Sequence, residues 1–220
     1  KIPQILIILV SAIVLISSIS FGLITNSRFL LILCIYLFLM TLYSLIIKKV
    51  FLVDIISIAI GYMLRVYGGA IIVVNSMDET ISVSIWLILC TGFASLFVLS
   101  IKRFSEITND KLTSRSSLSG NKSKLLYNSI NLNELLTYIS YSFYCISINF
   151  SSIFSANTPS DLSLLLTLPL VILGMRRFKK DSLNSSYGDQ PEEIIFKSKF
   201  IILIFFSWII ISSLIIYVRN

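Results

Sequence analysis

The side chains in this sequence that could do chemistry are ionisable groups set inside long apolar runs. Asp54 lies near the start and Arg65 near the middle of the run 51–74. An ionisable group at the centre of a membrane-spanning helix costs about 2.5–3.5 kcal/mol on insertion scales. Each of these two charges therefore needs a compensating partner.

One face of the helix predicted over this run carries both charges together with small residues. Residues at spacings of four, three, four and three share a helical face, and here they are Asp54, Ile58, Gly61, Arg65 and Gly68, with Ser57 beside them. The opposite face consists of Ile56, Ile60, Met63, Tyr67 and Ala70. Asp54 and Arg65 are eleven residues and about 16 Å apart along the axis, too far to pair with each other. The face either lines a polar cavity or holds two different neighbours in place.

More cations stand at the ends of neighbouring apolar runs. Lys48 precedes Asp54, while Lys102 and Arg103 follow a later run, with Glu106 one helical turn beyond Lys102. Several cations that converge on a membrane cavity suit a diphosphate, because each can donate a charge-assisted hydrogen bond to a phosphate oxygen. Two carboxylates are a small provision for magnesium, which binds one or two carboxylates together with substrate oxygens.

The elements that must position these residues are predicted to be membrane helices. Of 220 residues, 56% are hydrophobic and 13% charged, against roughly a quarter charged in soluble domains. The absence of histidine excludes Ser/His/Asp triads and histidine-ligated metals. Seven apolar runs approach the roughly 20 residues that cross a bilayer, and they are 5–24, 29–47, 51–74, 82–101, 135–154, 162–175 and 200–218.

The charges between these runs alternate in sign. The connections at Lys48, at 102–133 and at 176–199 are basic, whereas those with Asp78 and with Asp161 are acidic. Because cytoplasmic loops keep an excess of Lys and Arg, we expect the basic connections to be cytoplasmic loops of one polytopic all-α domain. The net charge of +7 is then a topology signal, and a nucleic-acid partner is not expected.

The order of the charged motifs resembles the UbiA superfamily of intramembrane prenyltransferases. The matching segments are YSLIIKK (43–49), Asp54, LRVYGGA (64–70) and KRFSE (102–106). They are most similar to the branch that contains decaprenyl-phosphate phosphoribosyltransferase, in which YSxxLKR, a downstream Asp, LRxxAGA and KRxxE occur in this order. Towards the carboxyl end, the branch's LTxPFxxYGxFRY and GDPEE segments are similar to LTLP (166–169) with Gly174 and Arg177, and to GDQPEE (188–193).

The resemblance implies a bundle of about nine transmembrane helices in a bacterial cytoplasmic membrane, seven of them in this chain. It implies Mg²⁺-dependent transfer of a 5-phosphoribosyl group from phosphoribosyl diphosphate to a polyprenyl phosphate lipid, with loss of diphosphate, to supply a pentose donor for the cell envelope. A homo-oligomer is left open. The implied phosphate-binding residues are Tyr43, Lys48, Arg65, Lys102 and Arg103, and the implied catalytic carboxylates, which orient these cations or the ribose hydroxyls, are Asp54 and Glu106.

One departure from the family keeps alternatives open. The NDxxDxxxD motif that supplies the family's metal carboxylates is not in this sequence, so we expect it, with the first two family helices, upstream of Lys1. A protein that begins at Lys1 is predicted to be inactive. The alternatives are a UbiA-type prenyltransferase with an aromatic or haem acceptor, a transporter-like membrane protein, and an inactive fragment. The prenyltransferase is disfavoured because KRFSE stands where those enzymes carry DxxxD.

Overall fold

The structure is a computed structural model that describes residues 4–50, 52–76, 83–110, 118–154, 162–184 and 190–219. These residues form helices and contain no strand, as the sequence predicts. The helices are α1 (Gln4–Thr25), α2 (Ser27–Leu45), η1 (Ile47–Lys49), α3 (Val53–Ser76), α4 (Ile85–Asp110), α5 (Leu118–Phe154), η2 (Leu162–Thr167), α6 (Leu168–Asn184), α7 (Pro191–Lys197) and α8 (Lys199–Arg219). The acidic connections with Asp78 and Asp161 lie outside the described residues.

Four of the described helices are long and apolar enough to cross a membrane. The apolar spans are Ser27–Leu45, Val53–Val73, Ile85–Thr108 and Lys199–Tyr217, and α1 adds the shorter apolar segment Leu9–Ile24. Their large apolar side chains are widely exposed, for example Ile16 at 64% and Leu203 at 63%. Such surfaces suit lipid contact. The four spans support a membrane protein, while the expected seven spans stay a prediction.

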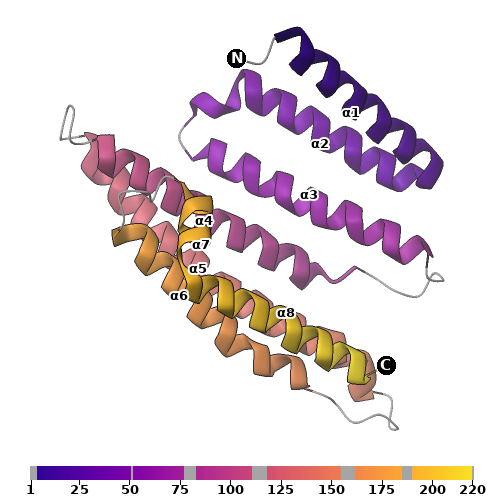
Figure 1. The fold of residues 1–220 in the computed structure, drawn as a ribbon, viewed down its shortest axis with the longest axis vertical. Helices are drawn as coiled ribbons and strands as arrows, with labels where there is room; N and C mark the ends of the chain where they lie inside the picture. The colour runs from indigo at the N-terminus through magenta and orange to yellow at the C-terminus, as the bar shows by residue number, and fades with distance from the viewer. Residues whose placement is uncertain are drawn as a thin grey trace. The chain divides into compact units, whose positions relative to one another are not determined.

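The helices pack as two compact units, Lys1–Val83 and Ser84–Asn220, which we call unit 1 and unit 2. In unit 1, α1, α2 and α3 lie side by side (Figure 1). The turn between α1 and α2 is short because Asn26 caps α2, its side-chain oxygen accepting from the Arg28 amide at 2.7 Å. Between α2 and α3, Leu52 has a φ of 69°, a left-handed conformation unusual for leucine.

The face predicted for the Asp54–Arg65 helix is the face that α3 packs with. On this face Asp54, Ser57, Gly61 and Gly68 are buried but Arg65 is exposed, and on the other side Ile56, Ile60 and Tyr67 are exposed. A Cβ built on Gly68 would lie 3.5 Å from the side chains of Ile32 and Phe29 of α2, and one on Gly61 would meet Met40. The small residues therefore serve close approach of a neighbouring helix, one of the two roles that such residues can have.

In unit 2, α4 and α5 form a long antiparallel pair. As the residue number rises along α4, the residue number of the contacting partner on α5 falls. The contacting pairs are Trp86–Phe143, Cys90–Thr137, Ser100–Ser129 and Phe104–Tyr127. Several of the buried residues between the two helices are small and polar, including Ser100, Asn133 and Thr137. Small polar side chains allow close packing and mutual hydrogen bonds between membrane helices.

Helices α6, α7 and α8 complete unit 2 around an apolar core. The core residues come from five helices and are Phe97, Ile101, Ile130, Phe178, Ile194 and Ile201. A second cluster joins Tyr141, Leu164 and Trp208, and the Trp208 indole N–H donates to the Tyr141 hydroxyl at 3.0 Å. Pro169 is the second residue of α6 rather than an interior residue, where its missing N–H costs no helical hydrogen bond. The apolar run 162–175 thus begins as a short 3₁₀ helix.

Two of the three basic connections predicted as loops, 102–133 and 176–199, are largely helical. Helix α4 continues to Asp110 and α5 begins at Leu118, so most of 102–133 is helix. Likewise α6 continues to Asn184 and α7 covers Pro191–Lys197 within 176–199. The Ser- and Asn-rich composition of 118–133 conceals apolar side chains at helical spacing, Leu126 and Ile130, which are fully buried. With 37 residues and a length of about 55 Å, α5 is longer than a bilayer core.

Candidate functional site

The Arg65 side chain lies between two tyrosine rings in unit 1. Its Nε donates to the Tyr36 hydroxyl at 3.1 Å, and its Nη2 makes a second hydrogen bond to the same oxygen. The guanidinium carbon lies 5.0 Å from the ring centroid of Tyr36 and 5.2 Å from that of Tyr62. These are cation–π contacts, which stabilise a guanidinium without neutralising its charge. Among the described residues Arg65 forms no ion pair, so its positive charge can act on an anion.

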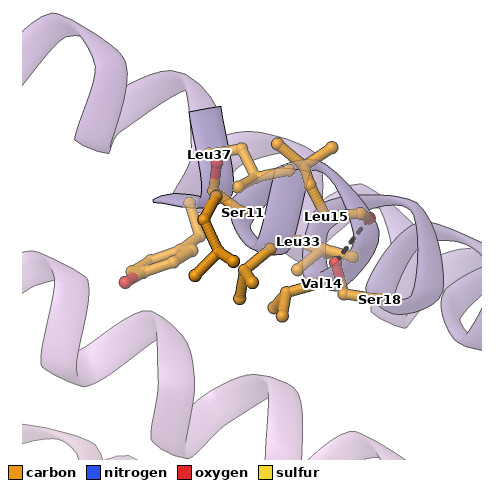
Figure 2. Close-up of a pocket in the computed structure, with 9 residues that line it drawn as sticks. Ser11, Val14, Leu15, Ser18, Leu33 and Leu37 are labelled. Atoms are coloured by element: carbon orange, nitrogen blue, oxygen red, sulfur yellow. Dashed lines mark hydrogen bonds between the residues drawn. The ribbon is translucent and has the colours of Figure 1, made fainter. Parts of the chain in front are cut away.

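Tyr36 also lines an apolar groove between α1 and α2, with a volume of about 710 Å³. Figure 2 shows the groove from close by, with Val14, Leu15 and Ser18 of α1 facing Leu33 and Leu37 of α2. The walls are almost entirely apolar because the Ser18 hydroxyl donates to the Leu15 carbonyl of its own helix at 2.8 Å. A single residue, Tyr36, thus contacts both an apolar groove and a guanidinium.

The remaining predicted residues of unit 1 lie around the connection between α2 and α3. Tyr43 is half-buried in the last turn of α2, and Lys48 is exposed in η1. Asp54 is buried in the first turn of α3, where its Oδ1 accepts from the Ile55 amide at 2.7 Å. A carboxylate at this position is stabilised by the amide dipoles of the helix N-terminus. As predicted, Asp54 and Arg65 have separate partners.

The predicted residues of unit 2 form a local cluster on the last turns of α4. Glu106 accepts from Arg103 Nη1 at 2.5 Å, and both side chains are about one-third exposed. Lys102, the residue before Arg103, is half-buried. Glu106 thus holds the guanidinium of its own helix, although the sequence had put it on one face with Lys102.

Sequence reasoning missed a more buried ion pair in unit 2. Lys179 of α6 donates to Glu134 Oε2 at 2.5 Å and to Asn131 Oδ1 at 2.6 Å, while the Tyr138 hydroxyl donates to Glu134 Oε1 at 2.8 Å. The Glu134 side chain is only 10% exposed. In the sequence Lys179 is one of several positive charges in the basic connection 176–199, and Glu134 directly precedes the apolar run 135–154. The signal available was the position of Glu134, an acidic residue at the border of an apolar run, where a charge needs a cationic partner.

The described carboxylates do not fit a resident magnesium site. No three His, Cys, Asp or Glu side chains gather as metal ligands among the residues that the structure describes. The carboxylates that the family resemblance selected are engaged within their own helices, Asp54 by an amide and Glu106 by a guanidinium. A magnesium ion would need oxygen ligands in addition to these. No chemical step is therefore derived through a metal held by these residues.

No protein-family model matches this chain, and no curated protein matches it either. The resemblance to the UbiA superfamily therefore rests on the motif residues quoted above. Magnesium, substrates and acceptor are accordingly proposals, to be judged by the chemistry that the described residues offer.

Proposed function

We propose that this protein is an intramembrane transferase that moves a 5-phosphoribosyl group from phosphoribosyl diphosphate to a polyprenyl phosphate. The observation that carries the proposal is Tyr36, which lines the α1–α2 groove and binds the Arg65 guanidinium. A polyprenyl phosphate has the same two parts, a long apolar chain and an anionic head. A groove with apolar walls next to a cation with neutral partners is complementary to such a lipid.

The reaction needs charge stabilisation more than it needs acid–base groups. A phosphate oxygen of the lipid forms a bond to ribose C1, while the bond between C1 and the diphosphate oxygen breaks and its electron pair leaves with diphosphate. Cations placed at the phosphates lower the barrier by stabilising the charge of the leaving group. In the proposal Tyr43, Lys48 and Arg65 are the phosphate-binding residues of unit 1, and, taken by itself, unit 2 contributes Lys102 and Arg103 as phosphate-binding residues.

The carboxylates of the proposal orient other groups. Glu106 fixes Arg103 through the ion pair within α4, and Asp54 accepts from the ribose hydroxyls or from a cation. Magnesium enters only as the counter-ion of the donor diphosphate. The protein resides in a bacterial cytoplasmic membrane with its basic connections in the cytoplasm, where phosphoribosyl diphosphate is available. Its lipid product serves a later glycosyl transfer to the cell envelope.

The test uses membranes that contain the full-length protein, supplied with labelled phosphoribosyl diphosphate, polyprenyl phosphate and magnesium. The expected product is lipid-soluble label that disappears with a chelator. Arg65→Gln and Lys102→Gln are each expected to lower the rate at least about a hundredfold, the scale seen when one donor to a reacting oxyanion is removed. The matched controls are Arg28→Gln and Lys124→Gln, which remove exposed cations from the same two units.

Three outcomes separate the possibilities. Loss of activity in both site variants with retention in both controls supports the proposal. Full activity in both site variants refutes the assignment of the phosphate-binding residues. Transfer of label from a prenyl diphosphate to an aromatic acceptor, with no reaction of phosphoribosyl diphosphate, refutes the proposed substrate in favour of a prenyltransferase.

A further inference from the structure

A polar pocket lies between α5 and α6 in unit 2, and the function proposed above does not use it. The pocket has a volume of about 410 Å³. It is lined by Glu134, Arg176, Lys179, Lys180, Leu183 and Asn184. Residues 176, 179, 180 and 183 recur at spacings of three, one and three, so α6 presents one face to it. The opposite face of α6 carries Phe178 into the apolar core.

The charges of the pocket are unbalanced. Its walls bring three cations and one carboxylate, which leaves a net charge of +2. Both oxygens of Glu134 are engaged, one by the Tyr138 hydroxyl and one by Lys179. The single negative charge of Glu134 can offset only one of the three positive charges, and Arg176 and Lys180 are exposed at the mouth of the pocket.

The ion pair between Glu134 and Lys179 fixes the position of one of the cations that line the pocket. Lys179 Nζ carries three hydrogens, and Glu134 and Asn131 accept two of them. Because the Glu134 side chain is 10% exposed and the Lys179 side chain 20% exposed, this ammonium is held in one place. The adjacent Arg177 differs, because it is paired with Asp181 at 3.0 Å and lies over the Phe200 ring. The uncompensated cations of α6 are thus confined to the pocket.

From these contacts we infer that the α5–α6 pocket is an anion site that binds a phosphate group through Arg176, Lys179 and Lys180. Arg176 offers the planar pair of donors that suits phosphate oxygens, and the two lysines add point charges. The phosphate can belong to the head group of an anionic lipid or to a soluble phosphate compound. Basic pockets between membrane helices bind anionic head groups by the same chemistry.

The experiment measures thermal unfolding of the full-length protein in nanodiscs. One series adds phosphatidylglycerol to phosphatidylcholine nanodiscs, and the other adds inorganic diphosphate to pure phosphatidylcholine nanodiscs. The site variant is the double substitution Arg176→Gln with Lys180→Gln. The matched control is Lys124→Gln with Lys199→Gln, which also removes two exposed positive charges from unit 2 but leaves the pocket intact.

At least one of the two anions is expected to raise the unfolding midpoint of the wild-type protein with increasing concentration. The site variant should need at least about tenfold more of that anion for the same rise, whereas the control should respond like the wild type. A response to phosphatidylglycerol alone that weakens in the site variant identifies a lipid head group, and a response to diphosphate alone that weakens in the site variant identifies a soluble ligand. Equal responses of the site variant and the control, or no response of the wild type to either anion, would overturn the inference.

Discussion

Arg65 and Tyr36 are 29 residues apart in sequence, yet the Arg65 Nε donates to the Tyr36 hydroxyl at 3.1 Å and the guanidinium covers the Tyr36 ring at 5.0 Å. The ring and the hydroxyl of one tyrosine thus hold the charge in an apolar helix. The Tyr62 ring contributes the second face at 5.2 Å. Because the hydroxyl and the ring of Tyr36 make different contacts with Arg65, a substitution can remove one contact and keep the other.

Replacing Tyr36 by Phe removes the acceptor hydroxyl and keeps the ring. We expect Tyr36→Phe to lower the free energy of unfolding by about 1–2 kcal/mol, because a hydrogen bond to a charged group is lost. Chemical denaturation in detergent micelles measures the change. The matched variant Tyr62→Phe keeps the cation–π contact, and we expect a change within about 0.5 kcal/mol. Equal losses in the two variants would mean that the hydroxyl of Tyr36 does not hold Arg65.

The groove between α1 and α2 can be filled without touching Arg65. Val14 lines the groove, and its neighbour Ile13, 63% exposed, does not. If the groove holds the lipid chain, Val14→Trp should raise the KM for polyprenyl phosphate about tenfold or more and leave the KM for phosphoribosyl diphosphate unchanged. The rise reflects lost burial of several methylenes at about 0.8 kcal/mol each. The reaction assay described above measures both constants.

Ile13→Trp is the control for the groove, because it places the same side chain on α1 at an exposed position that does not line the groove. It should leave both constants within a factor of about two. A similar rise in both variants would show that added bulk anywhere on α1 disturbs the protein, and no rise with Val14→Trp would place the lipid chain elsewhere.

The part of the site that sequence alone could predict is the face of α3. Spacings of three and four fix which residues share a helical face, and of the predicted group Asp54, Ser57, Gly61 and Gly68 are buried whereas Arg65 is exposed. Periodicity within one helix says nothing about the neighbour. The contact between Arg65 and Tyr36 depends on how α2 packs on α3, and no local pattern specifies that packing.

For the amino-terminal half of α5 the prediction was wrong, because a loop was expected where the structure has a helix. Its many Ser, Asn and Lys residues are typical of a loop. This composition hides the helical spacing of its buried residues. Leu126, Ile130, Asn133 and Thr137 nevertheless recur at spacings of three and four, and all four are buried in the structure. A helix that leaves the apolar layer keeps its period while its exposed face becomes polar. Glu134 was missed because it belongs to this extension.

The glycines of α3 allow a prediction about close packing. A Cβ built on Gly69 has nothing within 4 Å, whereas one built on Gly61 would meet the end of the Met40 side chain. Gly69→Ala should stabilise the protein by up to about 1 kcal/mol, because alanine is the better helix former. Gly61→Ala should gain less or lose stability, since Met40 must move.

Unfolding of the two alanine variants and of a double variant tests this. Adding Met40→Ala to Gly61→Ala removes the obstructing side chain, so the double variant should be more stable than the sum of the two single effects predicts. Strict additivity would contradict the close approach of α2 at Gly61.

The ion pair between Glu134 and Lys179 should stabilise unit 2 more than an exposed pair does. The side chains are 10% and 20% exposed, against 39% and 60% for Glu193 and Lys197. Removing one partner of a buried pair leaves an uncompensated charge, so Glu134→Gln should lower the free energy of unfolding by about 3 kcal/mol. Glu193→Gln should cost at most about 1 kcal/mol.

A rescue variant distinguishes the charge from the loss of packing. If the cost of Glu134→Gln comes from the stranded ammonium, then adding Lys179→Met should recover part of the lost stability, because a methionine needs no anionic partner. Lys197→Met added to Glu193→Gln should change little, since water already solvates that ammonium. Comparable losses for the two single variants, or a further loss on adding Lys179→Met, would show that Glu134 acts through its shape rather than through the charge of Lys179.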